Sequence, residues 1–302
     1  MAQLDVNGLQ IEYDTFGQAG ADPILLIMGL GTQMIAWSPD FCNALAEHGH
    51  HVIRFDNRDI GLSTKFDRAR PPSRLRYMLN HLLRVPLGEP YSLEDMASDT
   101  AGVLDALDLD SAHIVGASMG GMIAQLLAVN HPQRVKSLTS IMSTSGARHL
   151  PRARPEVVQH VFVDRPKTTD TNVLIEYLMT SLRLVGSPGY PQSDEELREQ
   201  FSASLDRSYY PQGFKRQFAA IVGDRSRVER LRRLDKPTLV IHGSEDPLVP
   251  VEHGIDTARH IAGAKLEIIE GMGHDLPPQL IDKLTTLIAA HAREHAGTPQ
   301  QY

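Results

Sequence analysis

Short apolar runs that alternate with helical patterns constrain the fold of this chain more than any other feature. Six runs have the length and residue types of strands buried on both faces, and they lie at 23–28, 51–56, 112–117, 135–143, 237–243 and 265–271. Helical patterns separate most of them, as in LEDMASDTAGVLDALDL and GGMIAQLLAVNH. Because strands that alternate with helices pair in parallel, this pattern predicts a parallel sheet with helices on both faces.

Two stretches depart from this pattern. At the N-terminus, AQLDV and LQIEYDTF alternate apolar and polar residues around Asn7-Gly8, a favoured two-residue turn, which predicts a hairpin. Residues 147–232 contain helical patterns and proline-rich joints but no clear buried strand. We interpret 147–232 as a helical cap inserted into a core formed by 1–146 and 233–302. The alternative is that this stretch continues the strand-helix alternation.

Composition places the chain among ordinary globular proteins. It has 302 residues, of which 41% are hydrophobic and 22% charged, and its formal net charge of −7 argues against a nucleic-acid partner. The single cysteine, Cys42, excludes an intrachain disulfide, fits a reducing compartment and is expected to be a buried, inert thiol. We find no signal-peptide pattern and no apolar run of about 18 residues, so we expect a cytoplasmic protein without a membrane span.

A serine lies at the junction of one predicted strand and the helix that follows it. Gly116-Ala117-Ser118-Met119-Gly120 fits the pattern G-x-S-x-G, with AHIV before it and GMIAQLLAV after it. A tight strand-to-helix turn strains the serine backbone, requires small neighbours and lifts the hydroxyl above the carboxyl edge of the sheet. Ser118 is therefore the candidate nucleophile. The alternative is a serine N-cap with glycines that only permit close packing.

A serine hydroxyl needs a base, and the base needs a carboxylate to orient it. In the G-x-S-x-G fold the chain order is serine, acid, histidine. His274 follows the last predicted strand and Asp246 follows the strand before it, so both are expected at the same sheet edge as Ser118. Glu245 is an alternative carboxylate, but the turn continued by Pro247 favours Asp246.

Two main-chain N–H groups are candidates for an oxyanion hole. One belongs to Met119, which follows the predicted nucleophile, and the other to Leu30, in the glycine-rich loop after the 23–28 strand. Glycines on both sides of Leu30 would let the main chain turn its donor inward. An ordinary strand-to-helix turn would also need glycine there.

The chain resembles the α/β-hydrolases over nearly its full length. The matching segments are IMGLG at 27–31, FDNRDIGLST at 55–64, GASMGG at 116–121, LVIHGSEDPLVP at 239–250 and GMGH at 271–274. Within that superfamily it looks closest to bacterial ester hydrolases with a helical cap, including the aclacinomycin methylesterase type. The resemblance implies an α/β-hydrolase fold, Ser118, Asp246 and His274 as the catalytic triad, no cofactor and no catalytic metal.

Two positions depart from the family pattern. Many relatives have His-Gly in the oxyanion loop where this chain has Met28-Gly29, so the hydrogen bonds that support the loop must differ. Relatives commonly have R-G-x-G-x-S after the fourth strand, whereas Asp59 stands here at the first glycine. Asp59 either braces the loop or faces the substrate, and we favour bracing.

The resulting hypothesis is a carboxylic ester hydrolase acting on a small molecule through an acyl-enzyme. Ser118 attacks the ester, His274 takes its proton and Asp246 orients the imidazole. Apolar residues near the serine predict a mainly apolar pocket: Leu30, Met34, Ile35, Met119 and Leu248. Met34 and Ile35 could equally belong to the core.

Several rival functions share the fold. Haloalkane dehalogenases and epoxide hydrolases use an aspartate nucleophile, and Ser118 argues against both. Carbon–carbon bond hydrolases, perhydrolases and acyltransferases keep the serine triad and stay open. A non-catalytic ligand-binding protein is a further alternative, which the intact set of three residues disfavours.

Overall fold

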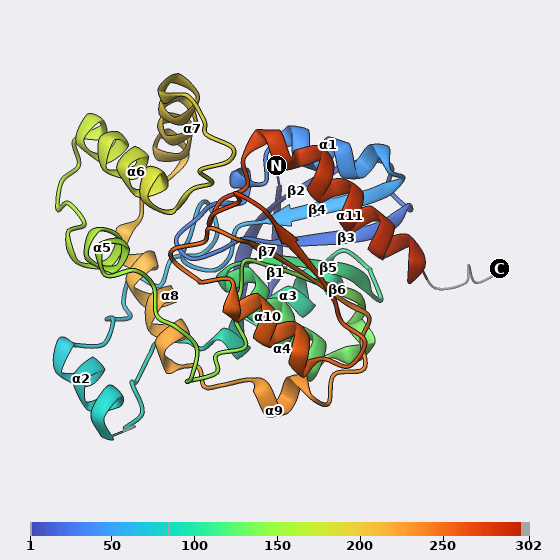
Figure 1. Ribbon diagram of the computed structural model, residues 1–302, viewed down its shortest axis with the longest axis horizontal. Helices are drawn as coiled ribbons and strands as arrows, with labels where there is room; N and C mark the ends of the chain where they lie inside the picture. The colour runs from blue at the N-terminus through green and yellow to red at the C-terminus, as the bar shows by residue number, and fades with distance from the viewer. Residues whose placement is uncertain (1, 84, 297–302) are drawn as a thin grey trace.

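The central element of the fold is one eight-stranded, mostly parallel sheet (Figure 1). The computed structural model describes residues 2–83 and 85–296. The strand order is β1-β2-β4-β3-β5-β6-β7-β8; β1 and β2 form the predicted hairpin, β2 pairs antiparallel with β4, and all later pairs are parallel. The strands are β1 Ala2–Val6, β2 Leu9–Phe16, β3 Asp22–Ile27, β4 His50–Phe55, β5 Ala112–Ala117, β6 Val135–Ile141, β7 Thr238–Gly243 and β8 Lys265–Ile269.

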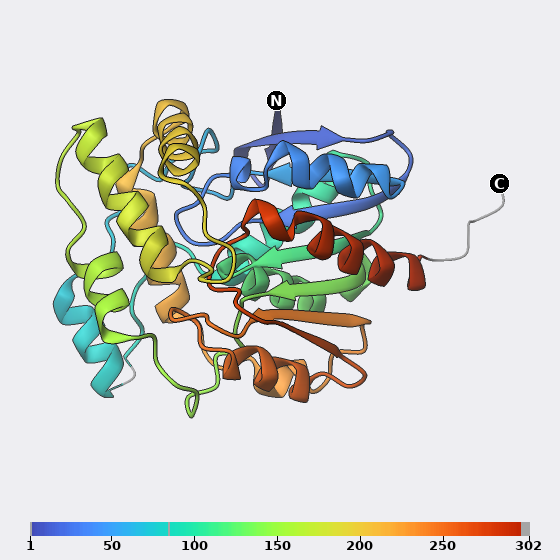
Figure 2. The ribbon, with the colours of Figure 1, turned by 45° about the horizontal axis from the view of Figure 1, so that its top comes forward.

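Helices cover both faces of this sheet, as predicted. Figure 2 shows α1 (Pro39–Glu47) and α11 (Ile281–Glu294) side by side on one face. On the other face, α3 (Leu93–Ala106) and α4 (Met119–Asn130) pack together, and α10 (Glu252–His260) packs on β7 and β8. Each face has its own apolar cluster, so the sheet is buried on both sides.

The chain between β6 and β7 is helical. It contains α5 (Pro155–Val158), a π-helical turn at Gln159–Val163, α6 (Thr171–Val185), α7 (Asp194–Arg207), α8 (Pro211–Gly223) and α9 (Val228–Leu231). All these residues are described, and none of them lies in a strand. Figures 1 and 2 show α5 to α8 gathered beyond one end of the strands, whereas α9 packs against α4 and α10. The division into a cap and a core at the predicted boundaries stays a proposal.

Local capping explains where several of these helices begin. Ser92 and Asp95 form a capping box at the start of α3, and Ser193 and Glu196 form one at the start of α7. The carboxylate of Asp170 accepts hydrogen bonds from the first N–H groups of α6. The proline-rich joint GSPGYPQSD therefore leads into a capped helix, whereas α5, after HLPRARPE, begins at Pro155 without a side-chain cap.

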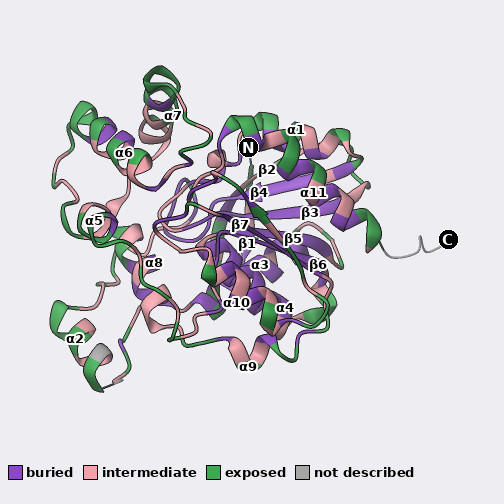
Figure 3. Ribbon diagram, in the orientation of Figure 1, coloured by how far each residue is buried: buried purple, intermediate pink, exposed green. Residues whose placement is uncertain are grey.

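One helix was not anticipated from the sequence. Helix α2 (Arg74–Leu83) lies apart from the sheet, near α8, and exposes apolar side chains of Leu75, Met78, Leu82 and Leu83 (Figures 1 and 3). Short 3-10 turns complete the fold at Met34–Ala36, Pro132–Arg134 and Pro278–Leu280.

Cys42 behaves as predicted. Its side chain is fully buried in α1, and burial raises the pKa of the thiol to about 12, so the thiol stays protonated and inert. Among the described residues, no helix has the length and apolar character that crossing a membrane requires.

Candidate active site

Ser118 occupies a strained turn between β5 and α4. Its backbone has φ 56° and ψ −118°, a region that residues with side chains seldom adopt. A Cβ added at Gly116 would lie 2.1 Å from the Gly120 carbonyl oxygen, and one at Gly120 would lie 2.0 Å from the Ile27 carbonyl oxygen. Only glycine fits at both positions, because the start of α4 lies too close to β5 at Gly116 and to the end of β3 at Gly120 for any side chain.

The structure brings Ser118, His274 and Asp246 into one hydrogen-bonded chain. The Ser118 hydroxyl lies 2.9 Å from His274 Nε2, and His274 Nδ1 lies 2.6 Å from Asp246 Oδ2. The three residues come from loops after β5, β8 and β7, so their meeting depends on the parallel order of these strands. Ser118 and His274 are half-buried, whereas Asp246 is buried. Glu245, the alternative acid, is exposed.

Asp246 is held as a charged group that accepts hydrogen bonds. Its second oxygen accepts from the N–H groups of Leu248 and Val249 at 2.9 and 2.7 Å. Burial by itself raises the pKa of Asp246, but His274, His242 and the Val249 N–H outweigh it and hold the pKa well below its usual range. Asp246 is therefore ionised at neutral pH and can stabilise a protonated imidazole.

The loop that carries His274 is anchored to the end of α6. The His274 N–H donates to the Val185 carbonyl at 2.7 Å. The Ser187 hydroxyl accepts from the Gly273 N–H at 2.8 Å and donates to the carboxylate of Asp275. Burial raises the pKa of Asp275 despite this contact. The position of the imidazole thus depends on a helix that lies far away in the sequence.

The loop that carries Leu30 lies beside the serine, and Met119 follows the serine directly in the chain. A Cβ added at Gly29 would lie 3.1 Å from the Ser118 Cβ, so the loop after β3 passes directly over the nucleophile. Gly31 has φ 67°, which turns the main chain after Leu30. In the described part of the chain, the Leu30 and Met119 N–H groups donate to no protein acceptor, so both could serve an oxyanion.

Three residues that the sequence analysis missed support this loop. Asn57 donates to the Met28 carbonyl at 2.9 Å, and Asp56 accepts from the Met34 N–H at 2.7 Å. Gln217, from α8, accepts from the Gly31 N–H at 2.9 Å and donates to the Arg58 carbonyl at 2.9 Å. Asp56 and Asn57 lie in the segment FDNRD, which could have drawn attention to them; nothing in the sequence indicated Gln217.

Asp59 braces its loop, as the sequence analysis favoured. It is fully buried with φ 71°, and its carboxylate binds the Arg216 guanidinium at 2.7 and 2.8 Å. The Tyr91 hydroxyl and the Phe66 N–H also donate to it, at 2.7 and 2.8 Å. Asp59 therefore ties the loop after β4 to α8.

A cavity opens next to the oxyanion loop, between Gly31 and helices α6 to α8. Its lining includes five aromatic side chains, from Tyr177, Phe201, Tyr209, Tyr210 and Phe214. The pocket residues predicted from the sequence, Met34, Ile35 and Leu248, are not among those that line this cavity. Met34 is fully buried, while Ile35 and Leu248 are half-buried, and their contact with a substrate stays a prediction.

Comparison with known proteins agrees with this architecture. The model of the α/β hydrolase fold family matches residues 22–278. Rhodomycin D methylesterase DauP from Streptomyces sp. (strain C5) is 31% identical over 92% of this chain and 93% of its own length. A 2-hydroxymuconate semialdehyde hydrolase from Pseudomonas sp. (strain CF600) is 30% identical over 83% of this chain and 80% of its own.

The fold is shared with solved structures as well. A meta-cleavage product hydrolase (CumD) from Pseudomonas fluorescens IP01 superposes with a TM-score of 0.75 over 97% of this chain and 98% of its own, at 22% identity. Three findings support the same family assignment: the family match, the sheet order and the strained turn at Ser118. This chain belongs to the α/β-hydrolase family and is a hydrolase enzyme.

Proposed function

We propose that this protein hydrolyses carboxylic esters through an acyl-enzyme formed on Ser118. The observation that carries the proposal is the continuous path from the Ser118 hydroxyl through His274 to the buried, ionised Asp246, with distances of 2.9 and 2.6 Å. The relatives named as methylesterases, at 31% and 30% identity over 92% of this chain, favour an ester as the substrate.

The proposed reaction proceeds in two halves. The Ser118 oxygen attacks the ester carbonyl while His274 Nε2 takes its proton, and the N–H groups of Leu30 and Met119 stabilise the oxyanion. His274 then protonates the leaving alcohol, and the acyl group stays on Ser118. In the second half, His274 activates a water molecule, which releases the acid and regenerates the serine.

The cavity beside the oxyanion loop supports a bulky acid with aromatic character. Five aromatic rings line it, and such rings pack well against flat apolar surfaces. A small leaving alcohol, such as methanol, agrees with the methylesterase relatives. We therefore propose a methyl ester of a large, largely apolar acid as the substrate class, with no nucleic-acid partner and a cytoplasmic location.

Carbon–carbon bond hydrolysis is the second candidate. The 2-hydroxymuconate semialdehyde hydrolase at 30% identity over 83% of this chain favours it. The same three residues would serve both reactions, so assays of methyl esters and of vinylogous diketones side by side would separate them. Turnover of the diketones alone would replace the ester proposal.

The first experiment is to label the purified protein with a fluorophosphonate probe and map the modified residue by mass spectrometry. We expect labelling at Ser118, and its loss in Ser118→Ala and His274→Ala. His131→Ala is the matched control, because His131 ends α4 and lies outside the site. Absence of labelling in the folded wild-type protein would reject the activated serine and favour the ligand-binding alternative.

A further inference from the structure

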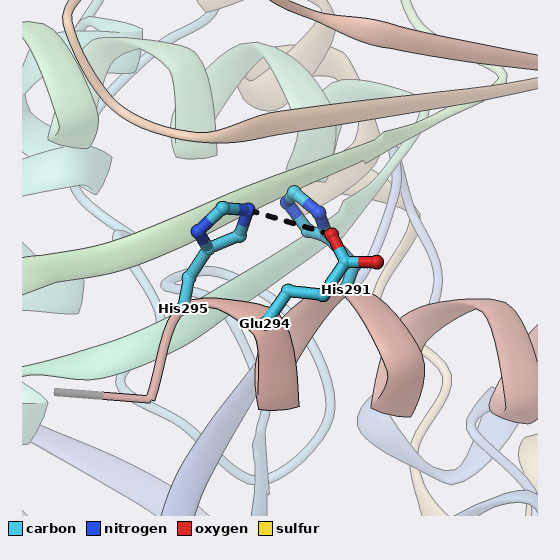
Figure 4. A group of neighbouring side chains, drawn as sticks. All are labelled: His291, Glu294 and His295. Atoms are coloured by element: carbon cyan, nitrogen blue, oxygen red, sulfur yellow. Dashed lines mark ion pairs between the residues drawn. The ribbon is translucent and has the colours of Figure 1, made fainter. Parts of the chain in front are cut away.

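A group of potential metal ligands lies at the last turn of α11, outside the proposed active site. It consists of His291, Glu294 and His295, whose side chains converge in Figure 4. In the described part of the chain this is the only group of three or more such residues with ligand atoms within 4.8 Å of one another. The two histidines are four residues apart, His291 in the last turn of α11 and His295 at its C-cap, so both lie at the same end of the helix.

His291 is the unusual member of this group. Its side chain is only 3% exposed, and neither ring nitrogen makes a hydrogen bond with a described residue. The Pro237 carbonyl is close enough to influence the ring but forms no hydrogen bond of normal geometry with it. A buried imidazole normally has a partner, so His291 offers an unused nitrogen to this site.

The three side chains lie close to one another, with one ligand atom of each within 4.8 Å of those of the other two. His295 Nε2 lies 3.9 Å from Glu294 Oε2, and the two histidine rings have centroids 5.0 Å apart.

We propose that His291, Glu294 and His295 bind a divalent transition-metal ion of the Zn²⁺ type. Two imidazoles and one carboxylate are a ligand set that Zn²⁺ accepts, with water in the fourth position. Ligand atoms around a tetrahedral Zn²⁺ stand about 3.4 Å apart. The ligand atoms of this group lie within 4.8 Å of one another, so rotation of the exposed Glu294 and half-buried His295 side chains would bring them to the distances that the ion requires.

The position of the group indicates a structural role. Lys265, the first residue of β8, forms an ion pair with Glu294, and Pro237 precedes β7. The group thus lies at the amino ends of β7 and β8, whereas Asp246 and His274 follow their carboxyl ends. A bound ion would clamp the end of α11 and leave ester turnover unchanged.

Lys265 competes with the ion for Glu294. The metal must displace the ammonium group or share the carboxylate with it, and the positive charge opposes a second cation nearby. We therefore expect Lys265→Met to bind the ion several-fold more tightly than the wild type. Weaker binding by Lys265→Met would overturn the role assigned to Glu294.

The test uses the full chain without an affinity tag, stripped of metal with a chelator. Co²⁺ is added as a spectroscopic probe and then displaced with Zn²⁺, so that d–d absorption reports tetrahedral binding and competition gives the dissociation constant. We expect one Co²⁺ per chain. Removing a residue that only hydrogen-bonds to a metal ligand weakens metal sites about 10–100-fold, so removing a ligand itself in His295→Gln or Glu294→Gln should weaken binding at least 10-fold.

His131→Gln is the matched control, because His131 is also a helix-terminal histidine but lies at the end of α4, on the other face of the sheet. It should bind Co²⁺ as the wild type does. Zn²⁺ should raise the melting temperature of the wild type and of His131→Gln but not of His295→Gln. Absence of d–d absorption in the wild type, or equal affinity in His295→Gln, would overturn the proposal.

Discussion

At the scale of single residues, Gln217 couples α8 to the loop that carries a proposed oxyanion donor. Its side-chain oxygen accepts from the Gly31 N–H, and its nitrogen donates to the Arg58 carbonyl. It is fully buried and contributes no group to the proposed chemistry. The side chains of Asn57, Asp56 and Gln217 together hold the main chain of this loop.

Replacement of Gln217 tests this positioning role. We expect Gln217→Met to lower kcat for ester hydrolysis about 10-fold, less than the 10²–10³-fold loss typical of removing a donor outright, because the loop shifts but keeps its N–H. KM should change less than kcat. Gln212→Met, at an exposed position on the same helix, is the control and should keep full activity. Equal loss in both variants would reject the role.

The role proposed for His274 predicts that activity depends on pH. In the proposed mechanism its neutral imidazole accepts the serine proton, so kcat/KM should fall on the acid side. Asp246 stays ionised there because its pKa lies well below the usual range, so the fall should follow a single proton. The measurement is kcat/KM from about pH 5 to 9. A flat profile would contradict the assignment of His274, and a two-proton slope would contradict that of Asp246.

At the scale of elements, one buried ion pair joins α8 to the loop after β4. Arg216 is 2% exposed and Asp59 is fully buried, and the guanidinium meets the carboxylate through two nitrogens. A buried ion pair stabilises the folded state little more than well-packed apolar residues of the same volume would. Removing one partner is nevertheless costly, because the other charge stays buried and unpaired.

Arg216→Met should therefore lower the free energy of unfolding by about 3–5 kcal/mol. Asp59→Asn in the same chain should recover part of this loss, because the unpaired charge is gone. The control is Arg232→Met, which removes an exposed pair with Glu229 and should change stability by about 0–1 kcal/mol. Denaturant unfolding of these three variants and of Asp59→Asn alone measures the losses. A loss in the double variant that equals the sum of the single losses would contradict this explanation.

At the scale of the whole molecule, Asp22 holds the amino ends of several strands together. It begins β3, and its carboxylate contacts His113 Nε2 of β5 at 2.9 Å and the Lys136 ammonium of β6. Its main-chain carbonyl lies 3.1 Å from His50 Nδ1 of β4. Burial raises the pKa of Asp22, but the hydrogen bonds from His113 and Lys136 outweigh it and place the pKa well below its usual range.

This lowered pKa predicts acid sensitivity. The ionised carboxylate stabilises the fold above the pKa of about 3.9 in the unfolded chain, and this contribution is lost as pH falls below that value. Asp22→Asn should therefore be less stable than the wild type at pH 7, with a difference that shrinks below about pH 4. Unfolding free energies from urea titrations at several pH values test this. A difference that stays constant with pH would exclude the carboxylate charge as its cause.

The sequence alone was sufficient to predict the mostly parallel sheet, the opening hairpin and the helical stretch before β7. It also predicted which loops carry Ser118, Asp246 and His274. These features are local: strand-forming runs, turn glycines and chain order all appear as short patterns. In a parallel sheet the carboxyl ends of the strands share one edge, so loops far apart in the sequence could be assigned to the same edge.

Only the tertiary structure decided which distant side chains support the site. Gln217, Arg216 and Val185 come from helices between β6 and β7, and no local pattern indicates that they meet the loops after β3, β4 and β8. The unpartnered nitrogens of His291 became visible only once β7 and β8 were placed beside α11. A short sequence pattern indicates which conformation a segment adopts. Contacts between helices and distant loops depend instead on how whole elements pack.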